Sequence, residues 1–435
     1  MDAAPRTAEP PVRRDRGPRG RRPPAVVTRL TARWGALPWW GRTVLLFLAV
    51  RAVSALLLAR AAQDQAWFPG VTAPAPDDID LRLSWDAQWY QRIATDGYPD
   101  TLPLDAEGRV AQNPWAFSPV FPLLARAVAA LTGTSFATVA PWLALAAATA
   151  AAVVLVRLLL DTLPAPTAEP VALAAITVWA AWPASPSLQM AYTEGPGMLV
   201  LAGVLLLLVR ERWWAAGLLA VLLGLTRPMA LPVTAVVLVA VGWRWRERGR
   251  RPIRRREGLA LLGVVGLSGL AGVLWPLVAW WGTGRREAYA DTMAAWRTGG
   301  EVQPLEPWLR TLRWAVEYPS SITVVPTIAL AVALTLSLVL LVPGAAPAVD
   351  VRLRVWCAAY TGYLLLVVDG TTSTVRYLTP LVPLAVLLLG AARGLPAWRR
   401  RHTLLTAGWV VAGVVGQAAW IWWIVVLAPP DFYPP

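Results

Sequence analysis

The chain has 435 residues, of which 57% are hydrophobic, and its mean hydropathy is +0.50. Its 40 basic residues are all arginine, and its net charge is +14. This charge is not carried by a soluble domain, because the charged stretches alternate with apolar runs of about 20 residues. The pattern excludes a nucleic-acid-binding protein and predicts an all-α polytopic membrane protein. The chain has one cysteine, Cys357, and one histidine, His402. These counts exclude a disulfide framework, a thiolate metal site and a multi-histidine centre.

The first 34 residues contain nine arginines and six prolines, a composition too polar to form a core. We expect residues 1–38 to be a disordered, basic cytoplasmic tail. No cleavable signal peptide is expected, because the charged stretch is long and no small-residue cleavage site follows an early apolar run.

Residues 39–430 are expected to form one transmembrane domain of about eleven helices. The predicted spans are 43–60, 136–160, 170–189, 194–210, 213–226, 228–242, 258–281, 321–343, 353–369, 376–393 and 403–428. The apolar stretch 119–132 contains Arg126 and is too short to cross, so we predict an interfacial or re-entrant helix there. It closes a long first extracytoplasmic loop, residues 61–135, and a second such loop covers residues 283–320.

Arginine placement gives the expected orientation. With a cytoplasmic N-terminus, the inner side holds 27 arginines and 9 acidic residues, whereas the outer side holds 12 arginines and 17 acidic residues. The loop 243–257 alone has eight arginines and two glutamates. The positive-inside rule therefore places this loop in the cytoplasm.

One stretch of the first outer loop, residues 84–98, combines a carboxylate with aromatic rings. Ser84 can cap a helix at its start and Gly97 can end it. On such a helix Asp86, Trp89 and Tyr90 share one face, which suits a site that holds a sugar and removes a proton from it. The alternative is a juxtamembrane helix whose aromatic residues lie at the lipid interface.

Ionisable residues also fall at three other outer turns. Glu194 begins the predicted fourth span, Arg227 lies between the fifth and sixth, and Asp369 and Arg376 flank the turn before the tenth. Such groups are costly near lipid, so they are usually paired or functional. The alternative is that the arginines extend to the membrane surface and Glu194 stabilises a helix start.

These residues suit glycosyl transfer from a lipid-linked sugar. Arginine pairs with a phosphate diester through charge-assisted hydrogen bonds, and a carboxylate can act as general base on an acceptor hydroxyl. No GxxxxGK[ST] or GxGxxG loop occurs to hold a nucleotide, which favours a lipid-borne donor.

Five ordered motifs carry a family resemblance: WDAQWYQRIATDGYP, FSPVFPLLAR, YTEGPGMLVLAGVLLLL, LLGLTRPMALP and VRYLTPLVPLAVLLL. Together, over roughly residues 40–395, they resemble the PIG-V-type mannosyltransferases and their bacterial relatives, in the glycosyltransferase C superfamily of polyprenyl-phosphate-sugar-dependent enzymes. The first motif is the most specific.

The resemblance implies that Asp86 is the catalytic base and that Glu194, Arg227 and Arg376 match family residues at later outer turns. We add Trp85, Trp89, Tyr90 and Tyr377 to the expected substrate-binding residues. Two departures are Ser118 to Pro122 in place of a more aromatic segment, and Gly195-Pro196-Gly197, which follows Glu194 where an apolar run is usual. The second could reshape the Glu194 turn.

The second outer loop contains a further candidate. Tyr289, Met293, Trp296 and Arg297 fall on one face of a predicted helix that ends at Gly299 and Gly300. We interpret it either as a lid or acceptor platform or as an interfacial amphipathic helix.

The sequence thus predicts an inverting mannosyltransferase in a bacterial plasma membrane, with its active site outside. Its partners would be polyprenyl-phosphate mannose, a glycolipid, lipoglycan or protein acceptor, and membrane lipids. No cofactor is required by the motifs, and a divalent metal remains open. The alternatives are a flippase or transporter of lipid-linked glycans and a non-catalytic structural member of the family.

Overall fold

The computed structural model describes residues 33–66, 77–297, 300, 302–318, 324–368 and 373–426. This part is mostly helical and has no strand, only an isolated bridge between Leu104 and Val110. Of the predicted tail, residues 1–32 lie outside the described residues, whereas residues 33–36 are helical.

Five helices of the described part are long and apolar enough to cross a membrane. They are α2 (Trp39–Ala62), α6 (Phe136–Thr162), α11 (Arg255–Thr283), α14 (Val324–Leu341) and α18 (Arg400–Trp420), which continues as a π-helical turn, Ile421–Val425. Leucines on their outer faces are strongly exposed, as at Leu56 and Leu262, each 72% exposed. Broad exposed apolar faces fit a multi-pass membrane protein.

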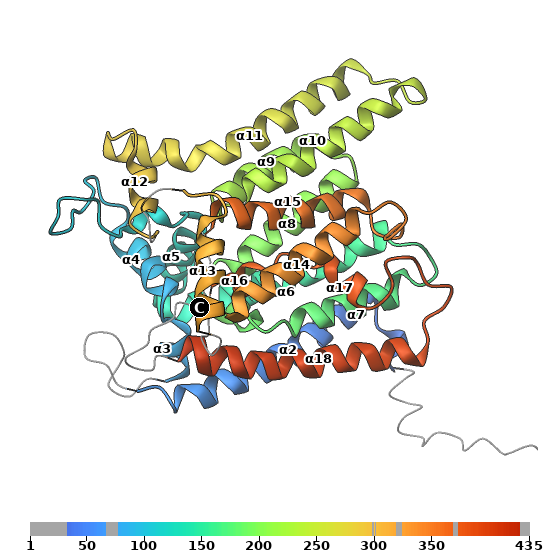
Figure 1. The fold of residues 1–435 in the computed structure, drawn as a ribbon, viewed down its shortest axis with the longest axis horizontal. Helices are drawn as coiled ribbons and strands as arrows, with labels where there is room; N and C mark the ends of the chain where they lie inside the picture. Colours follow the sequence, from blue (N-terminus) through green and yellow to red (C-terminus); the bar gives the residue numbers. More distant parts are fainter. Residues whose placement is uncertain are drawn as a thin grey trace, which may run out of the picture.

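The remaining bundle helices are shorter. They are α7 (Ala168–Ala180), α8 (Glu194–Val209), α9 (Trp213–Gly224), α10 (Ala230–Arg246) and α15 (Val351–Val367). In Figure 1, α9, α10 and α11 form one layer, α6, α8, α14 and α15 lie in the middle, and α2, α7 and α18 form the opposite layer.

Two predicted spans are not continuous helices. The span 170–189 is helical only to Ala180 and then turns before a 3-10 helix, Ser185–Gln189. Pro183 and Pro186 explain the break, because proline lacks a backbone donor and clashes with the preceding helical turn. The span 376–393 is likewise divided into α16 (Thr374–Tyr377) and α17 (Pro383–Leu388) on either side of Pro380.

Short helices gather at one end of the bundle, which we call the cap (Figure 1). The cap consists of α3 (Asp78–Arg82), α4 (Asp86–Asp96), α5 (Val120–Thr132), α12 (Ala288–Ala294) and α13 (Glu306–Glu317). The expected short helix at 119–132 is therefore present as α5, and its 13 residues are only about 20 Å long. Gly97, with φ +81°, ends α4 as the sequence predicts.

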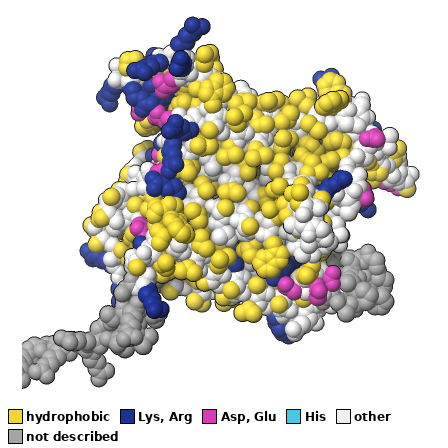
Figure 2. Space-filling model, turned by 180° about the vertical axis from the view of Figure 1, so that it is seen from behind, with side chains coloured by type: hydrophobic (Ala, Val, Ile, Leu, Met, Phe, Trp, Pro, Cys, Tyr) yellow, Lys and Arg dark blue, Asp and Glu magenta, His cyan; other side chains and the backbone are white. Residues whose placement is uncertain are grey.

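The opposite end carries the connection between α10 and α11, and we call it the arginine-rich end. Figure 2 shows a broad hydrophobic face with basic side chains gathered along one edge. The cap and the arginine-rich end lie at opposite ends of the long helices (Figure 1). The loops assigned to the two membrane sides thus separate along the bundle.

Candidate active site

Helix α4 begins at Asp86, directly after an unusual backbone conformation at Trp85. Trp85 has φ +59° and ψ −122°, which non-glycine residues rarely adopt. Its indole Nε1 donates to the carbonyl of Val425, 3.4 Å away, and so ties α4 to the end of α18. The predicted cap at Ser84 is wrong, because its hydroxyl donates to the carbonyl of Leu81, 2.7 Å away, in the preceding turn. Trp85 is therefore a positioning residue here.

Four charged residues that the sequence selected form one chain of ion pairs. Arg376 Nη1 lies 2.6 Å from Asp86 Oδ2 and 3.3 Å from Glu194 Oε1. Arg227 Nη1 lies 2.7 Å from the same oxygen of Glu194. The four residues come from α4, α8, α16 and the turn between α9 and α10, so the fold brings four distant segments to one site. Asp369, selected with them, lies outside the described residues.

Burial differs sharply along this chain of ion pairs. The side chain of Asp86 is 27% exposed, that of Arg227 is 14% exposed, and those of Arg376 and Glu194 are 4% and 3% exposed. A buried charge needs a partner to offset its lost hydration, and Glu194 supplies one to both guanidinium groups. Asp86 is the end of the chain that a ligand can reach most readily.

Tyr192 and Tyr377 enclose the guanidinium of Arg376. The Arg376 Cζ lies 4.9 Å from the Tyr192 ring centre and 5.4 Å from that of Tyr377. The Tyr192 hydroxyl donates to the carbonyl of Ser84, 3.2 Å away, and so connects this turn to the start of α4. Cation–π contacts of this kind hold an arginine without neutralising it. Tyr377 thus contacts the phosphate-binding candidate.

Thr193 links α4 to the second arginine. Its Oγ1 accepts a hydrogen bond from Arg227 Nη1 at 3.0 Å and lies 3.1 Å from the Tyr90 hydroxyl. Sequence analysis did not select Tyr192 or Thr193 as site residues. Their position immediately before Glu194 was the available signal, because a turn that positions one side chain also positions its neighbours.

Tyr90 is buried beneath the site rather than open to it, with only 6% of its surface exposed. Burial, and to a smaller extent the charge of Asp86, raises the pKa of Tyr90 above its ordinary value. The phenol therefore stays protonated and is suited to hydrogen bonding with Thr193. This placement makes Tyr90 a positioning residue for the turn that carries Glu194.

The Gly195-Pro196-Gly197 departure has a clear spatial reason. A Cβ at Gly195 would collide with the backbone carbonyl of Ala144 on α6, so glycine lets α8 approach α6 closely. A Cβ at Gly197 would lie only 2.6 Å from Cδ of Arg227. The two glycines therefore make room for the helix contact and for the arginine that pairs with Glu194.

Trp89 connects α4 to the segment that follows α12. Its ring stacks on Phe117 with centres 5.7 Å apart and meets Trp296 edge-on at 5.4 Å. The predicted helix through Trp296 and Arg297 is shorter than expected, because α12 ends at Ala294 and the chain then turns. Of its predicted end, Gly299 lies outside the described residues, whereas Gly300 is described.

A cleft of about 790 Å³ lies between residues 105–112 and residues 285–300. Its charged lining residues are Asp105, Arg109, Arg285, Asp291 and Arg297. Both aspartates are paired, Asp105 with Arg109 at 3.1 Å and Asp291 with Arg285 at 2.6 Å. Arg297 has no ion-pair partner among the described residues. None of the four residues of the ion-pair chain lines this cleft. The cleft is linked to α4 through Trp296, which is next to Arg297 and contacts Trp89.

Metal-binding groups are sparse in the described ranges, where no three histidine, cysteine, aspartate or glutamate side chains come together. The two carboxylates near each other, Asp86 and Glu194, are both paired with guanidinium groups. The site thus contains two carboxylates and two guanidinium groups. This set suits binding of a phosphate through the arginines and proton transfer to Asp86.

Comparison with known proteins gives no independent assignment of this site. No protein-family model matches the chain, and no curated protein matches it.

Proposed function

We propose that the chain is a membrane-embedded inverting glycosyltransferase, specifically a mannosyltransferase that uses polyprenyl-phosphate mannose. The acceptor would be a glycolipid, a lipoglycan or a protein. The observation that carries the proposal is the chain of ion pairs Asp86–Arg376–Glu194–Arg227. It joins a partly exposed carboxylate to two arginines, which is the set of groups that glycosyl transfer from a phosphate diester needs.

In the proposed reaction, an acceptor hydroxyl oxygen attacks the anomeric carbon of mannose and forms the new glycosidic bond. The hydroxyl proton passes to the Asp86 carboxylate. The bond between the anomeric carbon and the phosphate oxygen breaks, and its electron pair leaves with polyprenyl phosphate. Arg376 and Arg227 stabilise the negative charge of the leaving phosphate, because guanidinium groups match its oxygens in geometry and charge.

The outer cleft is a suitable place for the acceptor. It has a volume typical of small-molecule sites and is lined by planar charged groups able to hydrogen-bond to sugar hydroxyls. Trp296 contacts Trp89, which lies one helical turn after Asp86. An acceptor held in the cleft would thus approach the base along the aromatic face of α4.

The proposed membrane arrangement has about eleven spans, a cytoplasmic N-terminus and an extracytoplasmic cap. The separation of the cap from the arginine-rich end supports it, because arginine is retained on the cytoplasmic side. Sugar nucleotides are cytoplasmic, so a site in an outward-facing cap needs a donor that has already crossed on a lipid. A bacterial plasma membrane is the proposed location.

A transporter would instead place ionisable groups along a path through the bilayer. Arg51 in α2 is the main candidate, since it is 2% exposed. However, its guanidinium donates to the carbonyls of Ala180 and Ser185 and to the Ser185 hydroxyl. These bonds satisfy the broken end of α7, and they favour a structural role for Arg51 over transport.

The decisive experiment compares Asp86→Asn with wild type. Each purified protein, in lipid nanodiscs, receives radiolabelled polyprenyl-phosphate mannose and, as acceptor, an extract of its own cells' envelope that contains both lipids and proteins. We expect wild type to transfer the label and Asp86→Asn to lose at least about 100-fold in rate, since a general base is removed without a change of shape.

Asp96→Asn is the matched control, because Asp96 is an exposed carboxylate at the other end of α4. It should transfer label at the wild-type rate, and both variants should unfold at the wild-type temperature. A full rate in Asp86→Asn would remove the assigned base. Absence of transfer by wild type to any lipid or protein fraction of the extract would instead favour the non-catalytic or transport alternatives.

A further inference from the structure

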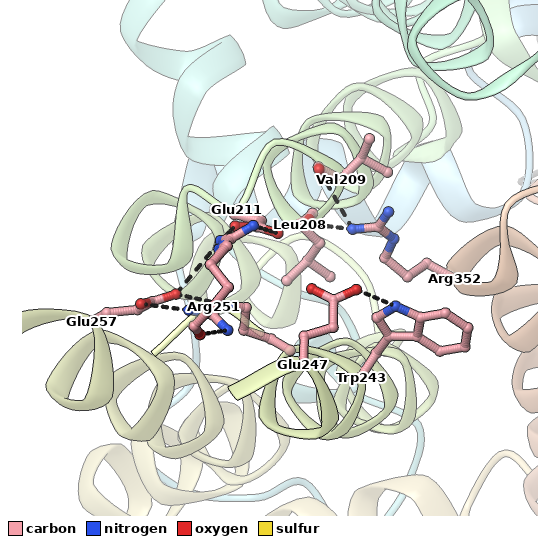
Figure 3. A network of polar contacts seen from close by, with 9 residues as sticks. Leu208, Val209, Glu211, Trp243, Glu247, Arg251, Glu257 and Arg352 are labelled. Carbon is pink, nitrogen blue, oxygen red and sulfur yellow. Dashed lines mark hydrogen bonds and ion pairs between the residues drawn. The ribbon is translucent and has the colours of Figure 1, made fainter. Parts of the chain in front are cut away.

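A second cavity, of about 370 Å³, lies at the arginine-rich end, far from the ion-pair chain of the cap. It is formed where the end of α10, the turn between α8 and α9, and the start of α15 meet. Figure 3 shows the polar network beside it, with Glu211, Trp243, Glu247 and Arg352 directed into the region between these elements.

Most charges around this cavity already have partners. Arg244 Nε and Nη2 lie 2.5 and 2.8 Å from the two carboxylate oxygens of Glu257. Arg352 makes two hydrogen bonds of 2.9 Å to Asp350 and also donates to the carbonyl of Leu208, in the last turn of α8. Glu211 is paired with Arg251 (Figure 3). In these three pairs each arginine is neutralised by one carboxylate, so the pairs add no net charge to the cavity.

Two lining residues of opposite charge remain. Glu247 accepts one hydrogen bond, from Trp243 Nε1 at 3.0 Å, and forms no ion pair with any described residue. Arg354 likewise has no ion-pair partner in the described ranges, and its buried Nε has no hydrogen-bond partner. A half-buried charge without a partner is costly, so the cavity offers complementary positions for one cation and one anion.

Aromatic residues place this cavity at an apolar boundary. Trp243 and Trp245, at the end of α10, are 53% and 54% exposed, as is typical of side chains at a lipid interface. Leu231 and Leu238 are exposed on one face of the same helix. A ligand with a charged end in the cavity could therefore lay an apolar part along α10.

We propose that this cavity binds the phosphoethanolamine headgroup of a phospholipid. The ammonium would pair with Glu247 beside the Trp243 ring, and the phosphate would pair with Arg354. A zwitterion satisfies both charges at once, whereas a purely anionic headgroup leaves Glu247 unpaired. The proposal does not depend on catalysis, because the cavity and the cap lie at opposite ends.

The test measures lipid binding to the purified full chain by native mass spectrometry. Wild type should bind phosphatidylethanolamine about fivefold more tightly than phosphatidylglycerol with the same acyl chains, the effect of one additional partly exposed ion pair. Glu247→Gln should remove this preference, and Arg354→Gln should weaken binding of both lipids. Equal affinity in wild type, or a preference that persists in Glu247→Gln, would overturn the proposal.

Glu317→Gln and Arg250→Gln are the matched controls, because both residues are exposed and lie outside the cavity lining. They should bind like wild type.

Millimolar O-phosphoethanolamine should displace the lipid, whereas glycerol phosphate should not. If neither displaces it, the acyl chains hold the lipid and the headgroup site is excluded. Unchanged unfolding temperatures in phosphatidylcholine identify variants that are correctly folded, and Glu247→Asp, which keeps the charge, should retain the preference.

Discussion

Asp86 and Arg376 are 290 residues apart in the sequence, and their Oδ2 and Nη1 atoms are 2.6 Å apart. The contact joins the first outer loop to the broken helical segment near the C-terminus. It is the longest-range ion pair of the site, and its two members were selected from the sequence for separate reasons.

Arg376→Lys should lower the turnover rate by about 100-fold, because lysine provides a single charge where the guanidinium provides a planar set of donors. Arg227→Lys should show a smaller loss, since Arg227 is farther along the chain from Asp86. Steady-state rates at varied donor concentration provide the measurement. Arg310→Lys, at an exposed position on α13, is the control. Wild-type rates in all three variants would mean that the two arginines serve only as charges at the membrane surface.

Glu194→Gln should reduce the free energy of unfolding by about 3 kcal/mol, because it leaves two nearly buried guanidinium groups with less negative charge. Thermal unfolding in detergent measures the effect. Glu194→Asp should recover part of the loss, since it keeps the charge. If Glu194→Gln is as stable as wild type, then hydration or the charge of Asp86 already offsets the charges of the two arginines.

Gly197→Ala should displace the side chain of Arg227, since the new methyl group would meet its Cδ at 2.6 Å. We expect up to about 100-fold slower transfer, the effect of misplacing a reacting group by about 1 Å. Gly242→Ala on α10 is the control, because nothing lies within 4 Å of the added methyl. Normal kinetics in both variants would show that Arg227 can move without loss of function.

The orientation can be tested with single cysteines in a Cys357→Ser background, where the native thiol is fully buried. An impermeant thiol reagent applied to intact cells should label Gln88→Cys, on the cap, and spare Gly249→Cys, at the arginine-rich end. Both positions should label in permeabilised cells. Labelling of Gly249→Cys alone in intact cells would invert the membrane arrangement and remove the argument for a lipid-borne donor.

The sequence predicted the helical class and the charged residues of the site for one reason. Arginines and carboxylates beside long apolar runs are few, and each needs a partner, so Asp86, Glu194, Arg227 and Arg376 could be selected without knowing their neighbours. Their contacts depend on how the helices pack and could not be read from periodicity. Tyr192 and Thr193 were missed for this reason, because their role comes from the residues that they contact.

Helix ends were the least predictable feature. The stretch 170–189 is strongly apolar only to Trp182, and the prolines and serines that follow signal that the helix stops. Ser84 has the composition of a helix cap, yet its hydroxyl bonds backward to Leu81, because Trp85 turns the chain first. At Ser84 the local preference was overridden by a turn that tertiary contacts stabilise, whereas the break after Ala180 follows from the local prolines.

The shared nitrogen of Arg376 has one more consequence. Its Nη1 contacts both Asp86 and Glu194, and Glu194 is also held by Arg227. If Asp86 moves away, Arg376 keeps a counter-ion, so separating the two does not strand a buried cation. The carboxylate at the accessible end is therefore detachable, and the inner three groups, two guanidinium groups and one carboxylate, then carry a net charge of +1.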